Sequence, residues 1–117
     1  MTSQGHAYAR FRRALDNGNT LAALAAAREL PQVGLSDALE LCLALRDDTS
    51  RYGPAVARWH ARFVLETRGV TLTESQAILA LLAAVPTSVR ACAALAELVD
   101  RRGYERAAEA LMRASRP

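Results

Sequence analysis

The sequence predicts an all-α protein of six or seven short antiparallel helices, arranged as a superhelical stack of helical hairpins or as a compact bundle. Three observations support this fold class. Apolar residues recur at spacings of three and four along the chain, Val and Ile are sparse, and Gly, Pro or capping residues divide the chain into short segments. The connections are short, so consecutive helices are expected to be antiparallel neighbours.

The first two predicted helices are separated by Asn17-Gly18. We expect the first over residues 6–17, because a glycine at this point adopts the left-handed conformation that ends helices. Asn19 or Thr20 is expected to cap the second helix, and Pro31 ends it.

The third and fourth helices are predicted to begin at Ser36 and Pro54. Ser36 is a suitable N-cap, and Asp37 and Glu40 complement the positive end of the helix dipole. Residues 38–45 are apolar on nearly every side, which indicates a helix that is buried in the middle of the domain or covered by a partner. A polar turn is expected before Pro54, which suits a first helical position.

Three further helices are predicted in the second half of the chain. Two overlapping capping boxes, at Thr71 and at Thr73, are alternative starts of the fifth helix, and Pro86 ends it. Gly103 separates the sixth helix from the seventh. The short connection at Pro86 leaves open whether the fifth helix pairs with the sixth or bridges two hairpins.

Length and composition predict one helical domain over residues 1–117, with residues 1–5 and 115–117 frayed. Hydrophobic residues make up 51% of the chain but aromatic residues only 5%, so Ala and Leu must supply most of the core. Cys42 and Cys92 are far apart and lie within apolar helical segments. We therefore expect two buried free thiols rather than a disulfide.

The charge pattern and the absence of targeting signals predict a soluble cytoplasmic protein with no membrane partner. The start of the chain lacks the basic and apolar regions of a signal peptide, and the longest apolar stretch, residues 77–85, is far shorter than the ~20 residues of a membrane span. The net charge is only +3, and all 15 basic residues are Arg, which we ascribe chiefly to the codon bias of a GC-rich genome.

One helical pattern occurs twice. Tyr52-x-x-Ala55-x-x-x-Trp59 recurs as Tyr104-x-x-Ala107-x-x-x-Leu111, and Thr20-x-x-Ala23-x-x-x-Ala27 is a weaker copy. A bulky residue, then a small one and then an apolar one form a stripe on one side of a helix. The small residue lets a neighbouring helix approach closely, which predicts stacked hairpins with a shared core.

Residues 95–114 resemble a tetratricopeptide repeat. Leu95, Ala96 and Val99 stand where that motif has its Leu, small residue and Tyr, and the second helix of the motif is matched by Ala107, Leu111 and Ala114. The turn is one residue shorter than usual, and Cys92 replaces a common Trp. The order of Arg28-Glu29-Leu30-Pro31, Asp37-Ala38-Leu39-Glu40-Leu41 and Arg58-Trp59 also resembles small helical proteins of GC-rich bacteria, a likeness that implies no function.

The sequence contains no pattern that predicts an enzyme, a metal site or a cofactor. His6 and His60 lack the neighbouring ligands that a metal needs. The serines that precede helices are explained as caps, and neither a Gly-x-Ser-x-Gly turn nor a Gly-rich phosphate loop is present. No small-molecule substrate is indicated either.

We therefore expect a non-catalytic protein–protein interaction module, a scaffold or adaptor that binds another protein or itself. Arg58, Arg62 and Glu66 follow one another every four residues and are the predicted polar contacts of such a surface. A solvated ladder of ion pairs explains the same three residues without a partner. Trp59 is expected in the core rather than as a binding hot spot.

Nucleic-acid binding is the alternative function. Its phosphate contacts are predicted from arginines near both ends of the chain, namely Arg10, Arg12, Arg13, Arg102 and Arg106. Acidic residues are interspersed with the arginines near the C-terminus, and no aromatic residues are placed for base stacking. Solvated helix faces with intrahelical ion pairs account for this pattern as well.

Overall fold

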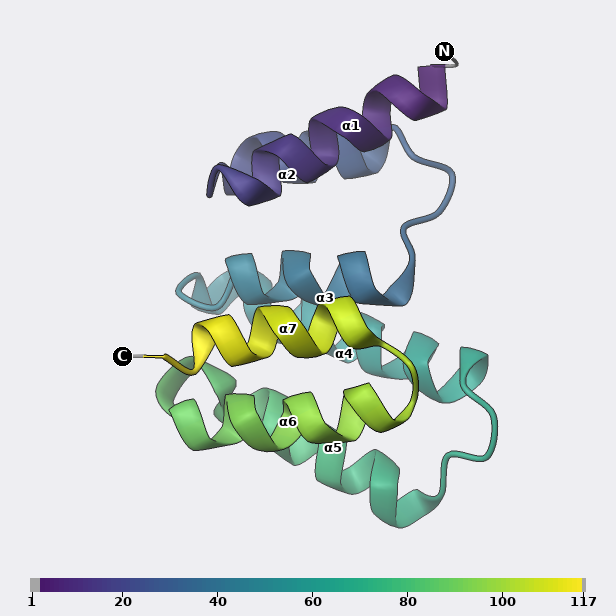
Figure 1. Cartoon of the computed structure of the whole chain (residues 1–117), viewed down its shortest axis with the longest axis vertical. Coiled ribbons are helices and arrows are strands. Elements are labelled where there is room, and N and C mark those ends of the chain that lie inside the picture. The colour runs from purple at the N-terminus through teal and green to yellow at the C-terminus, as the bar shows by residue number, and fades with distance from the viewer. Residues whose placement is uncertain (1–2, 117) are drawn as a thin grey trace. The chain divides into compact units, whose positions relative to one another are not determined.

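Seven α-helices and one short 3-10 helix make up the regular structure of residues 3–116, the part of the chain that the computed structural model describes (Figure 1). No strand occurs in this range, so the predicted all-α class is confirmed. The chain divides into two compact units, residues 1–34 and 35–117. Residues 3–5 belong to the first helix rather than fraying, whereas residues 1, 2 and 117 lie outside the described range. The expectation of one domain stays a prediction.

The first unit is a hairpin of α1 (Ser3–Asp16) and α2 (Thr20–Arg28), which lie against each other (Figure 1). Gly18 has a φ of +71°, and the side chain of Asn19 accepts a hydrogen bond of 3.1 Å from the backbone N–H of Ala22. The predicted boundary between the two helices is therefore confirmed, and Asn19 rather than Thr20 is the cap. The buried residues of this unit are small apart from one ring: Ala7, Phe11, Ala14, Ala23 and Ala26.

The second unit contains α3 (Leu35–Ala44), α4 (Thr49–Glu66), α5 (Leu72–Ala84), the 3-10 helix η1 (Val85–Thr87), α6 (Val89–Arg101) and α7 (Glu105–Ala114). Each α-helix packs on the next one in the chain, so α5 contacts both α4 and α6. In addition, α3 packs on α7. The predicted hairpins are present, and the contact between the first and last helices closes them into a bundle.

The starts of the third and fourth helices also differ from the prediction. The third helix begins at Leu35, so Ser36 lies inside its first turn and is not the N-cap. The fourth begins at Thr49, because the carboxylate of Asp48 accepts hydrogen bonds from the backbone N–H groups of Ser50 and Arg51. Pro54 therefore lies inside α4, and the residues before it are helical rather than a polar turn.

Of the two capping boxes proposed for the fifth helix, the structure contains the one at Thr71. Its hydroxyl accepts a hydrogen bond of 3.1 Å from the backbone N–H of Glu74. The alternative at Thr73 is wrong, because the helix already begins at Leu72, whose side chain is 74% exposed. The N-cap of α6 is Ser88, one of the two residues predicted for that role.

Trp59 lies at the centre of the second unit, as predicted for a core residue. Its ring is 2% exposed and is stacked on Phe63 with a centroid distance of 5.2 Å. The indole N–H donates a hydrogen bond of 2.9 Å to the backbone carbonyl of Leu35. Because that carbonyl is in the first residue of α3, the bond ties α4 to the start of the preceding helix.

Tyr52 compensates for a backbone hydrogen bond that α5 lacks. The carbonyl of Leu82 would normally accept from the N–H four residues later, but that residue is Pro86, which has none. The buried hydroxyl of Tyr52 donates to this carbonyl at 2.5 Å. Burial raises the pKa of Tyr52 above its ordinary value, so the hydroxyl keeps its proton and remains a donor.

Replacing Tyr52 by Phe should therefore lower the free energy of unfolding by about 1–3 kcal/mol, because the carbonyl of Leu82 is left buried without a donor. A second background provides the control. In the Pro86→Ala protein the restored N–H can reach the carbonyl of Leu82. The loss of unfolding free energy caused by Tyr52→Phe should therefore be smaller in that protein. Urea unfolding of the four proteins measures both losses, and equal losses in the two backgrounds would contradict this role of Tyr52.

Candidate protein-binding groove

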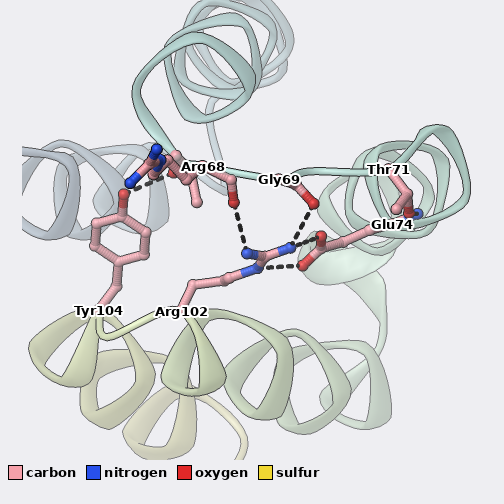
Figure 2. Close-up of polar contacts among 7 residues, drawn as sticks. Arg68, Gly69, Thr71, Glu74, Arg102 and Tyr104 are labelled. Carbon is pink, nitrogen blue, oxygen red and sulfur yellow. Dashed lines mark hydrogen bonds and ion pairs between the residues drawn. The ribbon is translucent and has the colours of Figure 1, made fainter.

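The turn that joins α6 to α7 is fixed to the loop between α4 and α5 by Arg102 (Figure 2). Its guanidinium pairs with both carboxylate oxygens of Glu74, with an Nε to Oε2 distance of 2.8 Å. It also donates to the backbone carbonyls of Arg68 at 2.8 Å and Gly69 at 3.2 Å. The charge of Arg102 is therefore held on the side of the turn that faces this loop.

Tyr104 reinforces the same connection. Its hydroxyl is 2.7 Å from the hydroxyl of Thr67, and its ring packs edge-on against Phe63 at 6.0 Å. Figure 2 shows Arg102 and Tyr104 directed from the turn toward the loop. Gly103, between them, has a φ of +89°, a conformation that favours glycine. The start of α7 is thus held in one orientation.

The ion pair with Arg102 makes the stability of the protein depend on the charge of Glu74. Hydrogen bonds from Arg102 hold the pKa of Glu74 below its ordinary value, and the N–H of Thr71 lowers it further. A lowered pKa means that this stabilisation is complete above the pKa of the unfolded chain. It is lost as the pH falls through the lower pKa of the folded state.

We predict that Glu74→Gln lowers the midpoint of thermal unfolding at pH 7 and that its difference from the unmodified protein narrows toward pH 3. The reason is that Gln keeps the shape of the side chain but not its charge. Glu97→Gln, at an exposed carboxylate, is the matched control and should leave the midpoint unchanged. If Glu74→Gln lowers the unfolding midpoint equally at pH 7 and pH 3, the ion pair with Arg102 does not depend on the charge of Glu74 and the prediction is contradicted.

A groove of about 570 Å³ runs between α6 and α7. It is lined by Ala96, Glu97, Asp100, Glu105, Ala108, Glu109, Met112, Arg113 and Arg116. The two alanines are buried and form a floor of small side chains, whereas Met112 is 45% exposed. We call this surface the α6–α7 groove.

The carboxylates of the α6–α7 groove differ from most of the others in the chain. Glu97, Asp100, Glu105 and Glu109 have no ion-pair or side-chain hydrogen-bond partner among the described residues. Seven other carboxylates of the chain are paired with arginine: Asp16, Glu29, Asp37, Glu40, Asp48, Glu66 and Glu74. The groove therefore carries negative charge that the fold does not neutralise.

Helix dipoles explain only part of this charge. Glu105 lies in the first turn of α7, where a carboxylate is favourable. Asp100 lies in the last turn of α6, where a carboxylate meets the negative end of the dipole. Arg113 and Arg116 line the other end of the groove, and the first of them also reaches Glu40 at 3.9 Å. The groove is thus acidic near the turn and basic at its far end.

The predicted partner contacts on α4 do not line this groove. Arg62 pairs with Glu66 at 2.8 Å, one helical turn away, which matches the ladder interpretation of these two residues. Arg58 is exposed on the same helix. A role of these three residues in partner binding stays a prediction.

Most of the predicted phosphate contacts are engaged in ion pairs. Arg10 pairs with Glu29 at 2.6 Å and Arg12 with Asp16 at 3.1 Å, both within the first unit. In the second unit Arg102 pairs with Glu74, and Arg106 lies 3.3 Å from Asp37. The fifth residue, Arg13, is exposed.

Two acidic residues of α3 have a role that the sequence did not reveal. Asp37 is only 3% exposed and pairs with Arg106, while Glu40 reaches Arg113, so both tie α3 to α7. In the sequence, their position near the start of the helix indicated only a favourable interaction with the helix dipole. The available signal was their position on the otherwise apolar helix, where a carboxylate needs a cationic partner if it is buried.

His60 and Ser75 also meet, although nothing in the sequence indicated it. The Nε2 atom of His60 is 2.9 Å from the hydroxyl of Ser75 and 3.1 Å from its backbone carbonyl. A carbonyl oxygen only accepts, whereas a hydroxyl can donate or accept, so the tautomer of His60 decides which of the two hydrogen bonds forms. The contact joins α4 to α5.

The two cysteines are free and buried, as predicted. Burial raises the pKa of the Cys42 thiol to about 12, so it stays protonated at neutral pH. Among residues 3–116, no cluster of three or more His, Cys, Asp or Glu side chains is arranged to hold a metal ion.

A second exposed surface lies on α4 and α5. A groove of about 430 Å³ there is lined by Arg46, Thr49, Tyr52, Gly53, Val56, Ala57, Leu79, Ala83 and Pro86. Leu65 and Leu72, on the same two helices, are largely exposed. The sequence predicted that α3 has apolar residues on nearly every side. In the structure it is α5 that exposes apolar residues, Leu72 and Leu79.

None of the helices in the described part of the chain has both the length and the apolar character needed to cross a membrane. Comparison with known proteins gave no match, whether with family models, with curated proteins or with solved structures.

Proposed function

We propose that the protein is a non-catalytic protein-interaction module and that its α6–α7 groove binds a helical segment of a partner protein. The observation that carries this proposal is the set of four unpaired carboxylates around a floor of small buried side chains. Charge that does not stabilise the fold is available for a partner. Two free cysteines suit the reducing cytoplasm, which we propose as the location.

The dimensions of the groove suit a helix. The ten residues of α7 are about 15 Å long, which corresponds to about three turns of a partner helix. Ala96 and Ala108 are too small to keep a partner backbone away, so close helix packing is sterically allowed. Met112 has a flexible thioether side chain that adapts to differently shaped partners. Together these features match the helix-in-groove mode of peptide recognition.

The resemblance to a tetratricopeptide repeat supports the same proposal. The resembling stretch, residues 95–114, spans the second half of α6 and all of α7, and the outer surface of these two helices forms the groove. Two small residues of that motif, Ala96 and Ala107, are buried. A helical hairpin that is packed closely by small residues is a suitable frame for a partner helix.

Nucleic-acid binding has less support. Four of the five arginines predicted to contact phosphate are paired with carboxylates, which reduces the positive potential that phosphate binding requires. The acidic end of the α6–α7 groove would repel a phosphate backbone. No observation in the structure favours this alternative over protein binding.

Selection of helical peptides from a display library of random 16-residue sequences tests the proposal. We expect enriched peptides that bind the unmodified protein and bind Glu109→Arg about tenfold more weakly, since that substitution reverses a charge on the groove rim. Asp47→Arg makes the same change of charge at an exposed carboxylate outside the groove. It should bind the peptides as the unmodified protein does.

Circular-dichroism melting first establishes that both variants are folded. A selection that enriches no peptide would overturn the proposed function. So would enriched peptides that bind the unmodified protein and both variants equally, because their site would then lie outside the groove.

A further inference from the structure

We infer that the segment bound in the α6–α7 groove is a basic amphipathic helix, whose Lys or Arg side chains lie over the end of the groove nearest the turn at Gly103. This inference rests on the proposed function and specifies the chemistry of the partner. Three features of the second unit carry it: the placement of the carboxylates, the way the nearby arginines are engaged, and the small side chains between the two rims.

The four carboxylates form two facing rims. Glu97 and Asp100 are three residues apart on α6, so they lie on the same side of that helix. Glu105 and Glu109 are four residues apart on α7 and form the opposite rim. All of them line the same groove. A helix lying between the rims would have negative charge along both of its flanks.

The arginines that stand nearest to Glu109 in sequence are engaged elsewhere. Arg106 and Arg113 are three and four residues away, the spacings at which ion pairs form within a helix. In the structure Arg106 pairs with the buried Asp37 of α3, and Arg113 reaches Glu40 of the same helix. The acids of α3 therefore pair with Arg106 and lie within reach of Arg113, which still lines the basic end of the groove.

Arg102 does not neutralise the carboxylates at the end of the groove nearest the turn. Although this arginine lies two residues from Asp100, its guanidinium points to the loop between α4 and α5 and pairs with Glu74 (Figure 2). Among residues 3–116, no arginine forms an ion pair with the carboxylates of this end, where Asp100 also opposes the dipole of α6. Cationic side chains of a bound helix would offset both the repulsion between these carboxylates and the unfavourable interaction of Asp100 with the dipole of α6.

Between the rims, Ala96 and Ala108 leave room only for the apolar face of an incoming helix. A partner that fits both features has small or apolar residues along one face and basic residues on its two flanks. Toward Met112 and Arg113 the rims lose their negative charge, so the partner needs no basic residues there. The basic residues are therefore expected in one half of the bound helix.

Three labelled 16-residue peptides test this inference. They share one Ala/Leu face and carry Lys, Gln or Glu at the flanking positions of one half. Fluorescence anisotropy should show that the Lys peptide binds the unmodified protein at least tenfold more tightly than the Gln peptide. Its affinity should fall between 50 and 300 mM NaCl, since exposed charge pairs are screened by salt. The Glu peptide should bind most weakly of the three.

Charge reversal on the protein gives the matching test. The double variant Glu105→Arg, Glu109→Arg should lose affinity for the Lys peptide and prefer the Glu peptide, whereas Asp47→Arg should behave like the unmodified protein. Equal binding of the Lys and Gln peptides, or a double variant that keeps its preference for Lys, would overturn the inference. If display selection still yields peptides that depend on Glu109, the proposed function stands although the inference has failed.

Discussion

The packing of α3 on α7 is the contact on which the second unit depends. Buried apolar residues of both helices and two ion pairs join the first helix of that unit to the last, which consecutive packing alone would leave apart. Asp37 is buried, and a buried carboxylate is tolerated only with a cationic or hydrogen-bonding partner. The apolar core and this electrostatic requirement of α3 together position α7, and with it the shape of the α6–α7 groove.

The same requirement determines the charge of the groove. An arginine on α7 can pair with a carboxylate of its own helix or with one on α3. In this structure Arg106 pairs with Asp37 of α3, and Arg113 lies 3.9 Å from Glu40 of the same helix. Arg102 is directed to the other side of the turn by Glu74 and two backbone carbonyls. Structure and function are thus coupled, since the contacts that hold the helices together leave the groove acidic.

Local backbone chemistry supports the frame around these ion pairs. Pro86, in η1, removes a donor at the end of α5, and the hydroxyl of Tyr52 on α4 supplies one instead. The indole of Trp59 connects the same helix to the start of α3. Both side chains belong to the repeated pattern that predicted close helix packing, and both also satisfy a carbonyl on another helix. The pattern predicted their burial but not their hydrogen bonds.

The sequence by itself determined the helical class, most of the helix boundaries and the burial of Trp59 and both cysteines, because these depend on residues a few positions apart. It misplaced the start of α4, since Asp48 and Pro54 are both acceptable near a helix start and only the formed hydrogen bonds distinguish them. Only the tertiary structure decided which arginine meets which carboxylate. That choice depends on which helix faces lie together, and the groove exists only once they do.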